Sequence, residues 1–155
     1  MSLIKSISGI RGTIGGQVNT NLTPIDTVKF AAAYGMWLKN HTNKKELTVI
    51  LGRDARISGK MVSSLVANTL VGLGINVTDI GLSTTPTVEL AVMLDAADGG
   101  IIITASHNPK QWNALKLLNH NGEFLNALDG EEVLEIAEND AYVFAEVDED
   151  RKSVV

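Results

Sequence analysis

The chain has 155 residues, of which 45% are hydrophobic and 20% charged, as in one ordinary globular domain rather than a disordered or fibrous protein. It contains no cysteine, which excludes disulfides, thiolate zinc sites and cysteine nucleophiles. Its net charge of −5 and the lack of an apolar run of roughly 18 residues lead us to expect a cytoplasmic protein with no nucleic-acid and no membrane partner.

The charge is unevenly distributed along the chain. Residues 129–155 hold ten acidic and two basic side chains, net −8, whereas residues 1–128 hold eleven bases and eight acids, net +3. A mildly basic body is compatible with a small anionic ligand, and the acidic C-terminal part is most simply a solvated helix and tail.

The N-terminal quarter predicts one strand and one helix. Residues 2–14 alternate apolar and polar positions in places and end among glycines, which indicates a strand with bulges. Thr23-Pro24 then opens a helix that ends near Asn40, with Thr23 as the N-cap. The helical spacing predicts a shared face for Ile25, Val28, Ala32 and Met36.

Strands and helices continue to alternate through the middle of the chain. We expect a buried parallel strand over 47–52, a helix over 58–72, a strand over 76–80, a helix over 85–94 and a strand over 100–104. This order is typical of α/β proteins in which helices cover a sheet of mainly parallel strands.

The C-terminal part adds a hairpin and a last helix. A loop over 105–112 leads to a strand at 115–118, which turns through Asn121-Gly122. Asp129 caps a helix that ends near residue 139. Together the elements predict a three-layer α/β/α domain with a mainly parallel, mixed central sheet.

Three polar segments follow predicted strands: residues 8–13, 52–56 and 104–109. Ligands gather at the carboxyl ends of strands in open α/β sheets, so we expect these segments to form one site. The guanidinium forks of Arg53 and Arg56 suit phosphate oxygens, which predicts phosphate binding. The alternative is that the arginines form ion pairs with Asp54 and with carboxylates of the C-terminal part.

Other phosphate-binding and hydrolase motifs are absent. Gly59-Lys60 lacks the surrounding residues of a P-loop, and residues 72–74 lack the third glycine of a dinucleotide fingerprint. Ser106 and His107 are adjacent, so on an extended segment they point to opposite sides and do not form a serine–histidine triad. From composition alone Ser106 is most simply an ordinary loop hydroxyl.

Four segments between residues 8 and 116 carry a resemblance. They are Ser8-Gly9-Ile10-Arg11-Gly12, Gly52-Arg53-Asp54-Ala55-Arg56, Thr104-Ala105-Ser106-His107-Asn108-Pro109 and Asn113-Ala114-Leu115-Lys116. In this order they resemble motifs of the α-D-phosphohexomutases, the family of phosphoglucomutases, phosphomannomutases and phosphoglucosamine mutases. The resemblance covers nearly the whole chain and implies the N-terminal α/β/α domain I of that family. Ala114 stands where the family usually has glycine.

The resemblance implies a role for each matching residue. Ser106 corresponds to the serine that holds the transferable phosphoryl group, with Arg11 and Lys116 beside it for charge stabilisation and proton transfer. His107 is expected among the catalytic residues and Asn108 among those that bind phosphate. A phosphoserine carries about −1.5 to −2 charges, so cationic neighbours are what such a group requires.

The resemblance also implies a reaction, the interconversion of hexose 1-phosphate and hexose 6-phosphate by an intramolecular phosphotransferase. Phospho-Ser106 would donate to the free hydroxyl of the hexose monophosphate, and the bisphosphate would then reorient and return its other phosphate to Ser106. Hexose 1,6-bisphosphate is then the activator. Mg²⁺, bound through the Ser106 phosphate and aspartates of another domain, is the expected cofactor.

We expect residues 1–140 to form domain I and residues 141–155 to lead to a second domain that this sequence lacks. The family's metal-binding aspartate run and the sugar-reading and phosphate-gripping loops of its later domains have no counterpart here. The chain alone is therefore expected to fold without turnover and to need the remaining domains of the same enzyme as partners. Two alternatives stay open: a stand-alone sugar-phosphate-binding module, and an interaction domain without catalysis.

Overall fold

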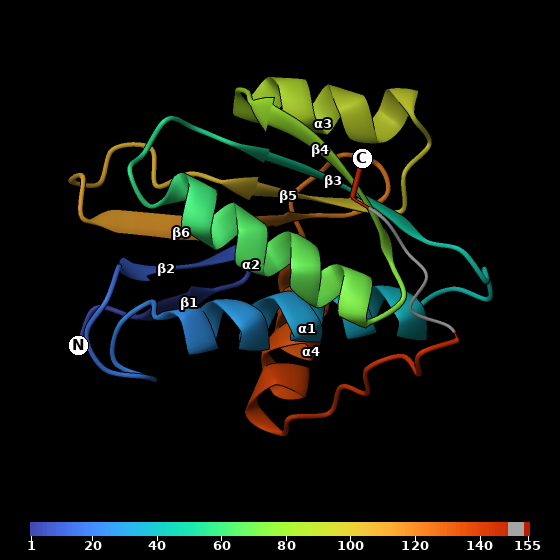
Figure 1. Ribbon diagram of the computed structural model, residues 1–155, viewed down its shortest axis with the longest axis horizontal. Coiled ribbons are helices and arrows are strands. Elements are labelled where there is room, and N and C mark those ends of the chain that lie inside the picture. The colour runs from blue at the N-terminus through green and yellow to red at the C-terminus, as the bar shows by residue number, and fades with distance from the viewer. Residues whose placement is uncertain (149–153) are drawn as a thin grey trace.

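In the computed structural model, which describes residues 1–148 and 154–155, strands and helices alternate through most of the chain (Figure 1). The elements are β1 (Ile4–Ser6), β2 (Gly9–Thr13), α1 (Pro24–Asn40), β3 (Thr48–Arg53), α2 (Gly59–Gly72), β4 (Asn76–Leu82), α3 (Thr85–Leu94), β5 (Gly99–Ile103), β6 (Trp112–Leu118) and α4 (Ala127–Glu138). This order confirms the predicted α/β class.

The strands form one six-stranded mixed sheet in the order β1-β2-β6-β5-β3-β4. Strands β2, β3, β4 and β5 run in one direction, and β1 and β6 run in the other. The pairs of β3 with β4 and with β5 are parallel, whereas β6 lies antiparallel between β5 and β2. The carboxyl ends of β2, β3 and β5 therefore lie at the same edge of the sheet.

Helices cover both faces of this sheet, as Figure 1 shows: α3 lies on one face, and α1, α2 and α4 lie on the other. The larger core forms on the three-helix face, and a smaller one packs Ile102 and Leu118 against Val88 and Val92 of α3. The three predicted layers are thus confirmed. Among the described residues, no helix is both long and apolar enough to cross a bilayer.

The N-terminal segment is a hairpin, and the prediction of one bulged strand over residues 2–14 is wrong. The chain turns between β1 and β2, where the Ser6 hydroxyl donates to the Gly9 carbonyl at 2.8 Å. Glycine is needed at position 9, because a Cβ there would lie 2.4 Å from the Leu115 carbonyl oxygen of β6. The close approach of β2 to β6 sets the register that places Arg11 opposite Ala114.

The first helix begins as predicted, but its buried side is wider than the predicted face and excludes Ile25. Thr23 and Asp26 form a capping box at its N-terminus. Of the predicted face, Ala32 is fully buried whereas Ile25 is 62% exposed. The large buried side chains are Phe30, Tyr34 and Trp37. Helices α2 and α4 contact α1, and the Tyr34 hydroxyl reaches β5 and β6 of the sheet. Bulky aromatic residues therefore dominate the buried side of this helix.

The last elements differ from the prediction in detail. Helix α4 begins three residues earlier than expected, because the Asn126 side chain, rather than Asp129, caps it by accepting from the Asp129 N–H. The hairpin through Asn121-Gly122 is reduced to a single bridge between Leu118 and Phe124. The short, polar Asn119–Glu123 turn therefore closes without a second full strand.

The segment that follows α4 runs past the end of α2. Its Ala145 N–H donates to the Gly72 carbonyl at 2.9 Å, and Tyr142 and Phe144 stack edge to face. Residues 149–153 of the predicted 141–155 segment lie outside the described residues. The domain boundary after residue 140 stays a prediction.

Candidate active site

Ser106 lies three residues beyond the carboxyl end of β5, in an exposed loop. Its φ of +46° is in the left-handed region, which residues other than glycine adopt at a cost of about 1–2 kcal/mol. Its N–H donates to Thr104 Oγ1 at 3.3 Å, and that hydroxyl donates to Asp54 Oδ2 at 2.7 Å. The backbone of Ser106 is therefore tied to the loop that follows β3.

The Ser106 hydroxyl faces a cation on the neighbouring strand. Lys116 Nζ of β6 donates to Ser106 Oγ at 3.0 Å. Arg11 of β2 pairs with Ala114, two positions from Lys116, so both cations lie on the face of the sheet that carries α3. Since α3 packs on β3 and β5, the neighbouring surface of β2 and β6 is where these charged side chains reach solvent.

A hollow of about 430 Å³ adjoins the hydroxyl. Its lining consists of Arg11, Ala105, Ser106, His107, Asn108, Ala114 and Lys116. The Arg11 side chain has no hydrogen-bond or ion-pair partner within residues 1–148 and 154–155. A positively charged hollow with a hydroxyl at its wall is suited to a phosphate group. Ala114, which stands where the family that the sequence resembles usually has glycine, occupies a regular position of β6 and leaves the strand intact.

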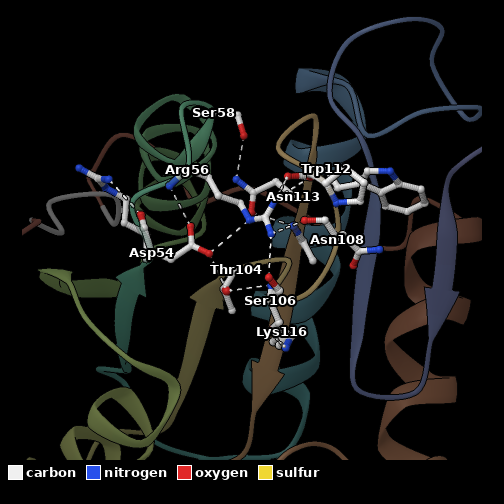
Figure 2. A network of polar contacts seen from close by, with 12 residues as sticks. Asp54, Arg56, Ser58, Thr104, Ser106, Asn108, Trp112, Asn113 and Lys116 are labelled. Carbon is white, nitrogen blue, oxygen red and sulfur yellow. Dashed lines mark hydrogen bonds and ion pairs between the residues drawn. The ribbon is translucent and has the colours of Figure 1, made fainter.

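Arg56 does not line this hollow, and its guanidinium points toward the backbone of the Ser106 loop (Figure 2). Its guanidinium donates to four backbone carbonyls of the Ser106 loop, those of Ser106, Asn108, Pro109 and Trp112. Its Nε lies 3.4 Å from Asp54 Oδ2. The ion pair with Asp54 that sequence reasoning held open as an alternative is thus present for Arg56.

The predicted site residues therefore fall into two groups. Arg11, Ser106, His107, Asn108 and Lys116 meet around one hollow, whereas Arg53 and Arg56 do not line it. Arg53 Nη1 donates to the Asp54 carbonyl at 3.3 Å, at the start of the next loop. His107 is exposed and, among the described residues, makes no hydrogen bond to Ser106, which fits the expectation that the two do not form a triad.

Sequence reasoning did not assign two residues that support the loop. Thr104 supplies the hydroxyl between Ser106 and Asp54, and its position two residues before Ser106 is the available signal for such a turn. The fully buried Asn113 donates to Ser58 Oγ at 2.9 Å, which ties the exit of the loop to the start of α2. Ser58 therefore binds Asn113 instead of capping α2 with its side chain.

The described residues supply few ligands for a metal ion. Residues 1–148 and 154–155 contain no group of three His, Asp or Glu side chains that could hold one. Asp54, the carboxylate closest to the loop, already accepts from Thr104 Oγ1 and from the Arg56 N–H. The octahedral set that Mg²⁺ requires is not provided by these residues, and Ser106 could supply at most one oxygen ligand.

Comparison with known proteins gives a consistent result. Residues 3–143 match the family model described as "Phosphoglucomutase/phosphomannomutase, alpha/beta/alpha domain I". A phosphoglucomutase/phosphomannomutase of Thermococcus kodakarensis is 41% identical over 113 residues, which are 72% of this chain and 25% of that protein. A phosphomannomutase of Vibrio cholerae is 32% identical over 146 residues, 94% of this chain and 30% of that protein.

Solved structures show the same fold. A putative phosphomannomutase from Thermus thermophilus superposes with a TM-score of 0.80 and 25% identity, over 100% of this chain and 34% of that one. The chain thus spans about a quarter to a third of the length of the proteins it matches.

Proposed function

Because the chain belongs to the phosphoglucomutase/phosphomannomutase family, as its α/β/α domain I, we propose that Ser106 carries the phosphoryl group that a hexose-phosphate mutase transfers. The observation that supports this most directly is the 3.0 Å contact of Lys116 Nζ with Ser106 Oγ at the wall of a cationic hollow. A phosphoserine requires such a cationic neighbour, because it carries about −1.5 to −2 charges.

The proposed reaction transfers one phosphoryl group in each direction. A free hydroxyl of the hexose monophosphate attacks the phosphorus of phospho-Ser106 and the bond to Ser106 Oγ breaks, while the proton of the sugar hydroxyl ends on Ser106 Oγ. The resulting hexose bisphosphate reorients in the site, and Ser106 Oγ attacks its other phosphate. The bond between that phosphorus and the sugar oxygen breaks, and the proton of the Ser106 hydroxyl ends on the sugar oxygen. The product monophosphate leaves with a hydroxyl where that phosphate was, and the serine is phosphorylated again.

The cations supply charge stabilisation in this scheme. Negative charge develops on Ser106 Oγ as the phosphoryl group leaves, and Lys116 Nζ is already placed to donate to that atom. Arg11, which has no partner among the described residues, binds the phosphate oxygens from the neighbouring strand β2. Phosphoryl transfer needs little from a protein beyond such positioning and charge.

The remaining predicted residues have subsidiary roles in the proposal. His107 and Asn108 line the hollow and contact the phosphorylated serine or the sugar phosphate. Arg53 acts at longer range, from the loop after β3. When Mg²⁺ is bound, it neutralises phosphate charge. Its remaining ligands would come from water, from substrate or from protein outside this chain.

The proposed activity belongs to a protein larger than this chain. The matched relatives are about three times as long as this chain, and we propose that their further domains supply the other walls of the site, with hexose 1,6-bisphosphate as the activator. The 155-residue chain alone is then expected to bind phosphate without measurable conversion of hexose 1-phosphate to hexose 6-phosphate.

Turnover by a serine variant tests the proposal. In a polypeptide that joins this chain to the family's remaining domains, Ser106→Ala should abolish mutase turnover, while Ser64→Ala on the exposed side of α2 should leave it unchanged. Normal turnover by Ser106→Ala would refute the phosphoserine. Conversion by the pure 155-residue chain would refute the need for other domains.

A further inference from the structure

We propose that Arg56 is a positioning residue for Ser106: its guanidinium holds the backbone of the serine loop and does not bind phosphate. This deepens the proposed function, on which it rests only in taking Ser106 as the reacting residue. It assigns to Arg56 a role different from the phosphate binding that the sequence predicts.

Four of the five N–H donors of the guanidinium make hydrogen bonds within the chain, and the fifth lies in an ion pair. Nη1 donates to the carbonyls of Pro109 and Trp112 at 2.7 and 3.1 Å, and Nη2 donates to those of Ser106 and Asn108 at 3.0 and 2.8 Å. The fifth donor, Nε, faces Asp54 Oδ2. A phosphate oxygen could bind either Nη group of Arg56 only by displacing a carbonyl of the serine loop.

The same contacts close a ring around the reacting residue. Arg56 holds the Ser106 carbonyl, the Ser106 N–H donates to Thr104, Thr104 donates to Asp54, and Asp54 pairs with Arg56 (Figure 2). Both backbone polar groups of Ser106 are thereby fixed. A residue at φ +46° persists where its surroundings determine it in this way, and the ring keeps Oγ directed at Lys116.

Charge balance separates Arg56 from the two cations of the hollow. Asp54 lies against Arg56 and accepts from its backbone N–H as well, so the pair adds little net charge to the phosphate site. Arg11 and Lys116 have no carboxylate partner among the described residues. The contribution of Arg56 is therefore geometric, and it depends on the planar fork that arginine has and lysine lacks.

Amide hydrogen exchange on the ¹⁵N-labelled 155-residue chain tests this inference without any assay of turnover. Arg56→Lys keeps the charge and loses the fork, so it should accelerate exchange at the Ser106, Asn108 and Trp112 amides by about tenfold or more. Amides of β5 should keep their wild-type rates. The matched control is Arg53→Lys, whose Nη1 donates to one carbonyl, and it should leave loop exchange unchanged.

Titration with inorganic phosphate, followed through the same amide signals, separates a positioning residue from a phosphate ligand. Arg11→Gln should weaken phosphate binding while loop exchange stays at the wild-type rate, whereas Arg56→Lys should show the reverse. Unchanged loop exchange in Arg56→Lys would overturn the inference, as would lost phosphate affinity with an intact loop. If Arg56→Lys does not fold, Thr104→Val removes one link of the ring and should accelerate exchange at Ser106; no acceleration would also overturn it.

In the polypeptide with the remaining domains, the inference predicts that Arg56→Lys lowers kcat and leaves the KM for the hexose phosphate unchanged. A phosphate ligand would instead raise KM, and a residue that served fold stability alone would change neither parameter in the folded enzyme. If Ser106→Ala retains turnover while Arg56→Lys accelerates exchange in the loop, the proposed function is wrong but the positioning role of Arg56 is supported.

Discussion

Two side chains hold the backbone at opposite ends of β5, and they do so in different surroundings. At the start of the strand, the fully buried Tyr34 hydroxyl accepts from the Gly100 N–H at 2.9 Å and donates to the Leu118 carbonyl of β6 at 2.6 Å. Beyond its end, Arg56 binds four carbonyls of the serine loop at a partly exposed rim, where 13% of its side chain is accessible.

The contacts at the start of β5 serve the stability of the sheet, whereas those beyond its end serve the candidate site. The Tyr34 contacts join β5 to β6 in an apolar core, so their loss weakens the whole sheet. The Arg56 contacts join a loop to a loop beside solvent, so their loss loosens the site while the core stays packed. The proposed phosphoryl-transfer site would require this second kind of support, because its reacting group must be both accessible and fixed.

The largest expected effect is on turnover, from a change at the carboxyl end of β5, beside Ser106. Lys116→Met removes the donor to Ser106 Oγ and should lower kcat of the multidomain enzyme by about 10²–10³-fold, the range seen when one charge-stabilising donor is lost. Thermal unfolding should be nearly unchanged. Lys60→Met, an exposed lysine on α2, is the control and should retain turnover. Equal kcat values in the two variants would contradict the role of Lys116.

The next effect is on stability, at the Tyr34 end. Tyr34→Phe leaves the buried Gly100 N–H without its acceptor and should lower the free energy of unfolding by about 1–3 kcal/mol. Urea denaturation of the 155-residue chain measures this. Inorganic phosphate should bind the variant with wild-type affinity. A weaker phosphate affinity in the folded variant would show that the two ends of β5 are not independent.

The stability of the chain should depend on the Tyr34 hydroxyl at alkaline pH. Burial, with a smaller contribution from the Asp98 charge, raises the pKa of Tyr34 above its ordinary value of 10.0, although the hydrogen bond with Gly100 opposes this. Above about pH 10 the unfolded chain therefore loses a proton that the folded chain keeps, and stability falls by up to about 1.4 kcal/mol per pH unit. Tyr34→Phe should show a shallower decline between pH 10 and 11.5. Identical slopes would contradict the assignment.

The smallest effect concerns the conformation of Ser106. Ser106→Gly and Ser106→Ala both remove the hydroxyl, but only glycine adopts φ +46° without strain. The glycine variant should be the more stable of the two by about 1 kcal/mol in urea denaturation. Equal stabilities would mean that Ser106 adopts its φ without strain, which would argue against the need for Arg56 as a positioning residue.

Much of the architecture follows from the sequence, because local signals and burial agree. The run of apolar residues in β5 and the Thr23 cap of α1 each specify their elements without help from distant contacts. The hairpin at residues 4–13 was not predictable in this way, because its register depends on the approach of Gly9 to Leu115, a contact distant in sequence.

The site shows the same division. The motif residues point to Ser106, and strand order then brings Arg11 and Lys116 to the same face, as the resemblance implies. The partners of Arg56 were beyond sequence reasoning, because four of its acceptors are backbone carbonyls, which carry no residue-specific signal. Only the three-dimensional course of the loop shows that this arginine faces the protein.

The most direct test of the account is the location of the phosphate. The multidomain polypeptide is incubated with a hexose 1,6-bisphosphate, and its peptides are then mapped by mass spectrometry. We predict one phosphoryl group, on Ser106, which is lost on treatment with excess hexose monophosphate. An active enzyme that carries no phosphate on Ser106, or carries it on another residue, would contradict the account.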